Sequence, residues 1–169
     1  EKAVGSSKNT VAFVGDSTFF ASGLPGIANA VYNQHDITVC VLDNSTTAMT
    51  GGQPHPGIGV TLMGQQAEGL SIETALEALG VKCIQHANPH RLDESIAAVQ
   101  EAVSFEGPAA VIFRAPCVNL IKPSPAVTID PEECKGCKKC ITSIGCPAIT
   151  WDGKVAAIDT TLCMGCNLC

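Results

Sequence analysis

Cysteine is the residue type whose spacing in this sequence most clearly indicates chemistry. The chain has 10 cysteines, and seven of them fall within the last 36 residues. These seven are Cys134, Cys137, Cys140, Cys146, Cys163, Cys166 and Cys169. They form two Cys-x-x-Cys-x-x-Cys triplets, each with glycine before its second cysteine, and one Cys-Pro pair after the first triplet. This spacing is typical of metal binding in a reducing compartment and not of a disulfide scaffold.

The two triplets predict a pair of iron–sulfur clusters. In two-cluster ferredoxins each triplet binds three corners of a cluster, and the Cys-Pro cysteine of the other copy binds the fourth. The complete 4Fe-4S set would be Cys146, Cys163, Cys166 and Cys169. The incomplete set would be Cys134, Cys137 and Cys140. Its fourth ligand is expected in a further Cys-Pro beyond the end of this sequence. Structural zinc, which also uses Cys-x-x-Cys pairs, is the alternative.

A second group of polar residues follows two predicted strands. Gly15-Asp16-Ser17 ends one strand and Asp43-Asn44 ends the next, with 28 positions between Asp16 and Asn44. In a parallel sheet both motifs would lie at the carboxyl edge, where ligands bind. Carboxylate, amide and carbonyl oxygens suit Mg²⁺ that holds a diphosphate. Taken separately, each motif is also an ordinary turn.

The paired motifs resemble the thiamine-diphosphate signature, in which Gly-Asp-x is followed further along by Asn. By that resemblance the Mg²⁺ ligands are Asp16, Asn44 and the Thr46 carbonyl, and Gly15 and Ser17 contact the cofactor. The loop that follows is similar to that of 2-oxoacid:ferredoxin oxidoreductases. The cofactor-binding residues implied in this loop are Thr50, Gly51, Gly52 and Gln53.

Residues 43–57, which end in Pro54-His55-Pro56-Gly57, are similar to the large (alpha) subunit of indolepyruvate:ferredoxin oxidoreductase. That family also carries a two-cluster ferredoxin segment after its thiamine domain. The family shares the gap of five residues between Cys140 and Cys146, which is longer than the three residues of the bacterial ferredoxin run. The resemblance implies oxidative decarboxylation of aryl pyruvates such as indolepyruvate to acyl-CoA. It implies thiamine diphosphate, Mg²⁺ and 4Fe-4S clusters as cofactors. The implied partners are a second (beta) subunit, ferredoxin, coenzyme A and the 2-oxoacid substrate.

Three alternatives stay open at this point. The chain could belong to a pyruvate or other 2-oxoacid:ferredoxin oxidoreductase, or to a non-catalytic electron-transfer module in which the α/β domain is a scaffold. His55, presented between two prolines, is a candidate for acting on the substrate carboxylate or as an acid/base, with capping of the loop as the other role. The glutamate that activates thiamine comes from a preceding domain in this family, so the isolated chain is expected to be inactive.

The elements that must position these residues follow from hydrophobic patterning. Strands are predicted at 10–14, 37–42, 81–85 and 109–113, and helices at 24–32, 72–79 and 92–103. Apolar strands that alternate with helices predict an α/β fold, with a parallel sheet covered on both faces. The expected domains are a thiamine-diphosphate-binding domain at 1–120, a linker at 121–127 and a small ferredoxin-like α+β segment at 128–169. Because the last segment lacks core-forming helices, bound clusters are expected to stabilise it.

Composition excludes several other classes of function. The net charge of -6 argues against a nucleic-acid partner, because no basic patch could release counterions. No apolar run approaches the roughly 18 residues of a membrane helix, and the first residues lack signal-peptide anatomy. We therefore expect a cytoplasmic protein with no membrane contact. The sequence begins with Glu1 in place of Met, so we expect it to begin inside a longer protein.

Overall fold

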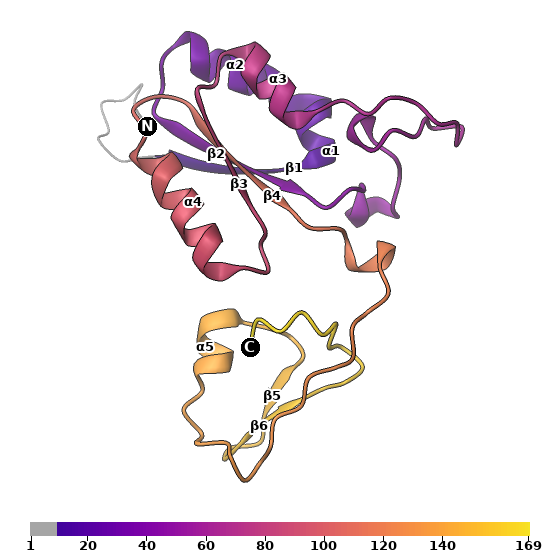
Figure 1. Ribbon diagram of the computed structural model, residues 1–169, viewed down its shortest axis with the longest axis vertical. Helices are drawn as coiled ribbons and strands as arrows, with labels where there is room; N and C mark the ends of the chain where they lie inside the picture. Colours follow the sequence, from indigo (N-terminus) through magenta and orange to yellow (C-terminus); the bar gives the residue numbers. More distant parts are fainter. Residues whose placement is uncertain (1–9) are drawn as a thin grey trace. The chain divides into compact units, whose positions relative to one another are not determined.

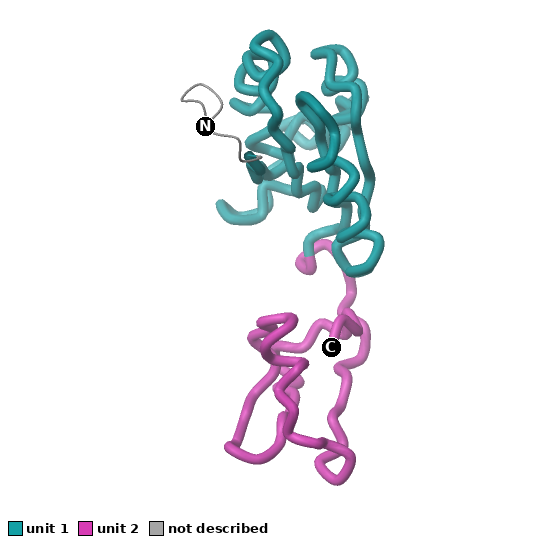
Figure 2. Tube along the Cα trace, turned by 90° about the vertical axis from the view of Figure 1, so that its left-hand side faces the viewer, with its two compact units in different colours: residues 1–117 teal, residues 118–169 magenta. Residues whose placement is uncertain are grey.

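The computed structural model describes residues 10–169, which lie in two compact units (Figure 2). The first unit ends at Cys117 and the second comprises Val118–Cys169. The start of the predicted 1–120 domain lies outside the described residues. Residues 121–127, expected to be a linker, fall within the second unit.

The first unit is built on a parallel four-stranded sheet. Its strands are β1 (Thr10–Gly15), β2 (Ile37–Asp43), β3 (Cys83–Ala87) and β4 (Ala109–Arg114), in the order β1-β2-β4-β3. The longer helices are α2 (Leu24–Tyr32), α3 (Ile72–Leu79) and α4 (Leu92–Ser104). The predicted α/β class and parallel sheet are confirmed.

Helices cover both faces of this sheet (Figure 1). The chain moves across the sheet in one direction from β1 to β3, and then returns to place β4 between β2 and β3. Because parallel crossovers are right-handed, this reversal puts α4 on the face opposite α2 and α3. One core, which includes Val41, Leu76 and Ile112, packs under α2 and α3. The other packs under α4 and includes Cys40, whose burial raises the pKa of its thiol.

The first helix begins earlier than predicted. The chain becomes helical at Asp16, passes through α1 (Asp16–Thr18) and the π-helix η2 (Phe19–Gly23), and continues into α2. The N–H of Leu24 donates to the carbonyl of Phe19, five residues earlier. Pro25 has no N–H, and its ring would clash with a carbonyl in a regular α-helix, so the wider π turn accommodates it. The predicted start at residue 24 is therefore only the start of the last segment.

Strand β3 begins two residues later than predicted, because main-chain N–H groups just before it form hydrogen bonds with the end of α3. Gly80 adopts a left-handed conformation with φ of 96°, and its N–H donates to the Glu77 carbonyl. The Val81 N–H donates to the Leu76 carbonyl at 3.1 Å. These two bonds form a Schellman motif, which satisfies carbonyls at the helix end. Val81 is therefore part of the helix cap, and the sheet ladder starts at Cys83.

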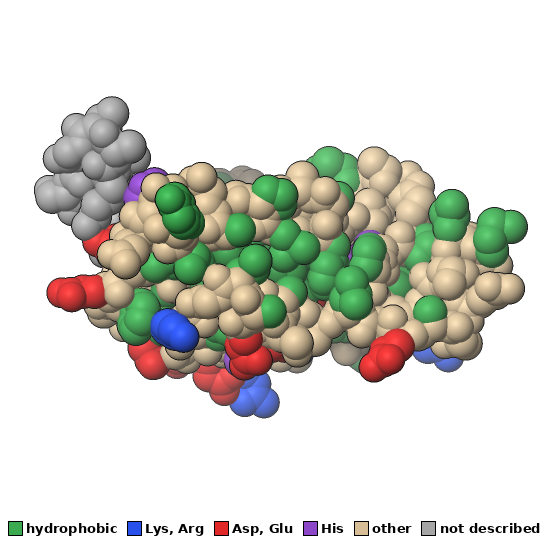
Figure 3. Space-filling model, turned by 90° about the horizontal axis from the view of Figure 1, so that it is seen from above, with side chains coloured by type: hydrophobic (Ala, Val, Ile, Leu, Met, Phe, Trp, Pro, Cys, Tyr) green, Lys and Arg blue, Asp and Glu red, His purple; other side chains and the backbone are tan. Residues whose placement is uncertain are grey.

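Strand β1 lies at the edge of the sheet, with β2 as its neighbour. An apolar groove of about 220 Å³ lies between β1 and α2, lined in part by Val14 and Ile27. Figure 3 shows apolar side chains grouped on the surface seen from above. The most exposed large apolar residues of the first unit are Met49, Tyr32, Met63, Leu62 and Phe13. None of the helices in residues 10–169 is long and apolar enough to cross a membrane.

The second unit has little regular structure. It contains a short 3-10 helix η5 (Val118–Leu120), the helix α5 (Lys139–Ile144), and an antiparallel pair of strands, β5 (Ile149–Trp151) and β6 (Ala156–Ile158). Its buried apolar residues are Ala148 and Ala156. Burial on this scale supplies little stability to so small a unit. The expectation that bound clusters stabilise it stays a prediction.

We predict that Leu76→Ala lowers the free energy of unfolding by about 2–5 kcal/mol, because it leaves a cavity where α3 packs on the sheet. Leu76 is 0% exposed, whereas Leu62 is 83% exposed. The matched control Leu62→Ala is expected to change the same quantity by less than about 0.5 kcal/mol. Urea unfolding monitored by circular dichroism measures both. Equal effects of the two substitutions would contradict the described core.

Candidate cofactor and metal sites

The carboxylate of Asp16 lies buried at the carboxyl end of β1 and is held by main-chain donors. Oδ1 accepts the Ser17 N–H at 2.7 Å. Oδ2 accepts the N–H groups of Asn44 at 3.0 Å and Ser45 at 2.9 Å. Parallel pairing of β1 with β2 brings these donors to Asp16, because the loop after β2 leaves the sheet beside the end of β1. Three N–H groups compensate the carboxylate for the water it has lost and fix its orientation.

The loop after β2 is folded tightly around this carboxylate. The side-chain oxygen of Asn44 accepts the Thr46 N–H at 3.1 Å, which closes an Asx turn over Ser45, whose φ is 64°. The carbonyl of Thr46 accepts the Ala48 N–H at 3.0 Å. Thr47 Oγ1 donates to Ser17 Oγ at 2.9 Å, so the Ser17 hydroxyl keeps its own proton for another acceptor.

Five of the predicted cofactor residues line one cavity of about 520 Å³. These five are Gly15, Asp16, Ser17, Asn44 and Thr46. A Cβ on Gly15 would meet no protein atom within 4 Å, so the described chain leaves space there. A carboxylate offers about four lone-pair sites, and Oδ1 of Asp16 uses one of them for Ser17. The carboxylate, amide, hydroxyl and carbonyl oxygens of Asp16, Asn44, Ser17 and Thr46 are of the kinds that fit Mg²⁺ with a diphosphate.

The other four predicted residues form a separate turn. Thr50 Oγ1 donates to Gln53 Oε1, and Gln53 Nε2 donates to the Thr50 carbonyl, both at 2.6 Å. Gly51 and Gly52 have φ values of 114° and 80°, which favour glycine. None of these four residues is among those that line the cavity of about 520 Å³. Their contact with the cofactor stays a prediction.

His55 is buried beside Asp16 and is 7% exposed. Its Nδ1 accepts the Gly57 N–H at 3.2 Å and so caps the 3-10 helix η4 (Pro56–Ile58). Its Nε2 lies 3.2 Å from Asp16 Oδ2, and its ring stacks on Phe20 with centroids 6.2 Å apart. The capping role is visible in these contacts. Action of His55 on a substrate stays a prediction.

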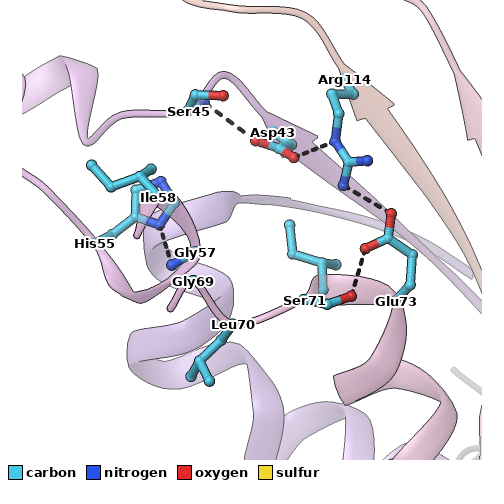
Figure 4. Close-up of a pocket in the computed structure, with 11 residues that line it drawn as sticks. Asp43, Ser45, His55, Gly57, Ile58, Gly69, Leu70, Ser71, Glu73 and Arg114 are labelled. Carbon is cyan, nitrogen blue, oxygen red and sulfur yellow. Dashed lines mark hydrogen bonds and ion pairs between the residues drawn. The ribbon is translucent and has the colours of Figure 1, made fainter. Parts of the chain in front are cut away.

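A second cavity, of about 450 Å³, is drawn in Figure 4. An ionic bridge on its wall joins three elements of the fold. Arg114 Nε is 2.7 Å from Asp43 Oδ2, and Arg114 Nη2 is 2.9 Å from Glu73 Oε1. Asp43 and Arg114 are direct partners in the β2–β4 register. Sequence reasoning missed Arg114 and Glu73. The charged residues that end two apolar strands, Asp43 and Arg114, were a usable signal for Arg114.

The same bridge shifts the pKa values of Glu73 and Arg114. Burial raises the pKa of Glu73, but hydrogen bonds from its own main chain, the Ser71 hydroxyl and Arg114 lower it, and the net direction is downward. The hydrogen bond to Asp43 raises the pKa of Arg114 despite partial desolvation, and Glu73 raises it further. Both shifts favour the charged forms of Glu73 and Arg114.

The cysteine triplets of the second unit share a backbone conformation. Gly136 and Gly165 have φ values of 64° and 67°. Lys138 and Asn167, which follow the second cysteine of each triplet, both have φ of 59°. Left-handed residues beside right-handed ones turn successive N–H groups into a concave surface, and many iron–sulfur sites use such a surface. The repeat in sequence is therefore also a repeat in backbone geometry.

An aspartate precedes each triplet in the same way, a feature that sequence reasoning missed. The Oδ1 atoms of Asp130 and Asp159 accept the N–H two residues later, each at 2.8 Å. Their carbonyls accept the N–H groups of Cys134 and Cys163, each at 3.0 Å. Hydrogen bonds from Thr161 lower the pKa of Asp159. The shared Ile-Asp, four residues before each first cysteine, was available from aligning the two copies.

The described chain does not gather the thiols into a metal centre. Within residues 10–169, no group of three or more His, Cys, Asp or Glu side chains lies close enough to hold a metal ion. All ten cysteines are free thiols, and the seven in the second unit are partly or fully exposed. The loops fit cluster binding in their backbone conformation alone. Ligation by the two predicted cysteine sets stays a prediction.

Comparison with known proteins agrees with the α/β fold of the first unit. It also agrees with the resemblance to the indolepyruvate oxidoreductase large subunit that the sequence indicated. The family model for the C-terminal TPP binding domain of thiamine pyrophosphate enzymes matches residues 2–113. The chain is 41% identical over 166 residues to indolepyruvate oxidoreductase subunit IorA of Methanothermobacter marburgensis, covering 96% of the chain and 27% of that protein. It is 38% identical over 165 residues to the subunit of the same name from Archaeoglobus fulgidus, covering 94% and 26%. The resemblance to this large subunit is confirmed.

The chain spans about a quarter of the length of the curated relatives it matches. Among solved structures, it resembles 2-oxoglutarate:ferredoxin oxidoreductase from Magnetococcus marinus with a TM-score of 0.56. The match covers 61% of this chain and 38% of the other, at 19% identity. At that identity the likeness shows a common fold.

We predict that Arg114→Met raises the pKa of Glu73 toward its ordinary value, because the carboxylate loses a hydrogen bond and a nearby positive charge. Since the folded-state pKa of Glu73 is depressed, its stabilising effect is present above the ordinary pKa and is lost as the pH falls through the folded value. Carbon-13 NMR titration of the side-chain carboxyl measures the shift. Arg91→Met is the control, because Arg91 pairs with Glu94. An unchanged Glu73 pKa in Arg114→Met would disprove the coupling.

Proposed function

Because this chain belongs to the thiamine pyrophosphate enzymes through their C-terminal TPP binding domain, we propose that its first unit holds thiamine diphosphate through Mg²⁺. The observation that carries this proposal is the buried carboxylate of Asp16, fixed by three main-chain N–H groups at a cavity that Asn44 and Thr46 also line. A buried charge held in one orientation beside an open cavity is suited to binding a cation.

The proposed ligands of the cation are Asp16, Asn44 and the carbonyl of Thr46, which come from the ends of β1 and β2. Ser17 accepts a hydrogen bond from Thr47, so its hydroxyl proton is free to bind a phosphate oxygen. When bound, thiamine diphosphate supplies the carbanion chemistry that decarboxylation of a 2-oxoacid requires. The contribution of these residues is to fix the diphosphate end and thereby the position of the reactive ring.

We propose that the protein containing this chain oxidises 2-oxoacids with ferredoxin as acceptor, and that aryl pyruvates such as indolepyruvate are its substrates. The names of the relatives support this proposal, as they are indolepyruvate oxidoreductase subunits. The product would be an acyl-CoA, and a second subunit would complete the enzyme. The glutamate that activates thiamine would come from another domain, and the isolated chain would then be inactive.

The second unit would carry electrons away from the thiamine site through 4Fe-4S clusters. Its support is the pair of cysteine triplets and their matching left-handed positions, which shape N–H groups for cluster sulfides. The proposed ligands are Cys146, Cys163, Cys166 and Cys169 for one cluster. Those for the other are Cys134, Cys137 and Cys140. A chain of clusters suits a one-electron acceptor such as ferredoxin.

Loss of the Asp16 carboxylate should abolish Mg²⁺-dependent binding of thiamine diphosphate. We expect Asp16→Ala to weaken it by more than the roughly 100-fold that changes around a metal's ligands cost. Titration calorimetry with the cofactor, in the presence and absence of Mg²⁺, measures this. Asp93→Ala, a change at an exposed position, serves as the control and should bind like the wild type. Binding that does not depend on Asp16 would indicate a scaffold and not a cofactor domain.

After anaerobic reconstitution, the wild-type chain should contain iron and sulfide and give an electron paramagnetic resonance signal when reduced. Cys166→Ser is expected to lower the iron content by about one cluster, because it removes a ligand of the complete set. Cys117→Ser, outside both sets, is expected to leave the iron content unchanged. Stoichiometric zinc with no such signal would favour the structural zinc alternative.

A further inference from the structure

We infer that His55 is a positioning residue for the cation site, and that it acts by holding the carboxylate of Asp16. This inference rests on the proposed function of the first unit. The side chains of His55 and Asp16 are 3% and 4% exposed, and Nε2 lies 3.2 Å from Oδ2. The other donors to this carboxylate are main-chain N–H groups, so the imidazole is the side chain that reaches it.

The hydrogen bond on the far side of the ring determines where the imidazole proton lies. Nδ1 accepts the N–H of Gly57 at 3.2 Å, so the neutral ring must carry its proton on Nε2. That places an N–H next to the acceptor Oδ2 of Asp16. Nε2 makes no hydrogen bond of standard geometry within the described residues, and it is fully buried. A better alignment of the two side chains would complete the bond, since hydrogen bonds in ligand-free sites are often poorly aligned and tighten when the ligand binds.

The surrounding chain holds the ring in place. Phe20 stacks on the imidazole at an interplanar angle of 23°. Gly57 permits this packing, because a Cβ there would lie 2.8 Å from Phe20 Cε2 and 3.1 Å from His55 Cε1. Pro54 and Pro56 fix φ on either side of the histidine. The Pro-His-Pro-Gly segment therefore has a physical role at the site although none of its residues lines the diphosphate cavity.

The two carboxylate oxygens of Asp16 have different contacts. Oδ2 accepts two main-chain N–H groups and faces the imidazole. Oδ1 accepts one N–H, from Ser17, and keeps a lone pair. Donors that crowd Oδ2 thereby leave Oδ1 as the oxygen for the cation. This is the arrangement by which groups behind a metal ligand orient it.

Two substitutions of His55 distinguish the positioning of Asp16 from the capping of the loop. The amide of asparagine reaches the place of Nδ1, so His55→Asn keeps an acceptor for Gly57 and loses the donor to Asp16. The amide of glutamine reaches the place of Nε2, so His55→Gln keeps the donor and loses the cap. Calorimetric titration of the full chain with Mg²⁺, at saturating thiamine diphosphate, gives the affinity of each. We expect a loss of about 10–100-fold for His55→Asn, and a loss of less than about 3-fold for His55→Gln.

Wild-type affinity in His55→Asn would overturn the inference. Equal losses in both variants, with equal falls in the thermal midpoint, would show a merely structural histidine and overturn it as well. If the wild-type chain binds no Mg²⁺ or cofactor, the proposed function fails, and nitrogen-15 NMR of the metal-free chain then decides the inference separately. A ring protonated at Nε2, whose Nε2 resonance moves in Asp16→Asn, supports it; protonation at Nδ1 overturns it.

Discussion

Removal of the Asp16 carboxylate from water is the constraint on which the rest of the first unit depends. A buried carboxylate needs hydrogen-bond donors, and here most of them come from the chain 28 and 29 residues further on. Those donors reach it only when β1 and β2 pair in parallel, with Gly15 opposite Leu42. The sheet register, the tight loop after β2 and the cavity at the strand ends are therefore parts of one arrangement around a single charge.

Much of this arrangement was predictable because it depends on local signals. Apolar runs located the strands, and the polar residues at the ends of two consecutive parallel strands had to meet at one edge. Residues whose partners are set by tertiary packing were not predictable. Arg114 meets Glu73 only because β4 returns between β2 and β3, and no short-range pattern indicates that strand order. Likewise, the sequence around His55 showed a rigid loop but not that Asp16 lies behind it.

Element boundaries departed from prediction where one backbone group had two possible partners. The Val81 N–H could have joined the sheet ladder, but it caps α3, so β3 starts at Cys83. The helix predicted to start at residue 24 begins at Asp16, because a π turn accommodates Pro25 within it. In the second unit the cysteine repeat was evident from the sequence, and its left-handed positions are a property of the chain. The positions of the thiols around a metal depend on the metal, so the chain alone does not supply them.

The bonds from Asn44 and Ser45 to Asp16 have a consequence for the dynamics of the fold. Both amides lie in a loop outside the strands, yet their protons are bonded to a buried carboxylate. Exchange of these protons with solvent requires the loop to lift from Asp16, whereas exchange in β2 and β4 requires the sheet itself to open. Amide exchange is therefore expected to be faster at Asn44 and Ser45 than in the middle of β2, because lifting the loop leaves the sheet ladder intact.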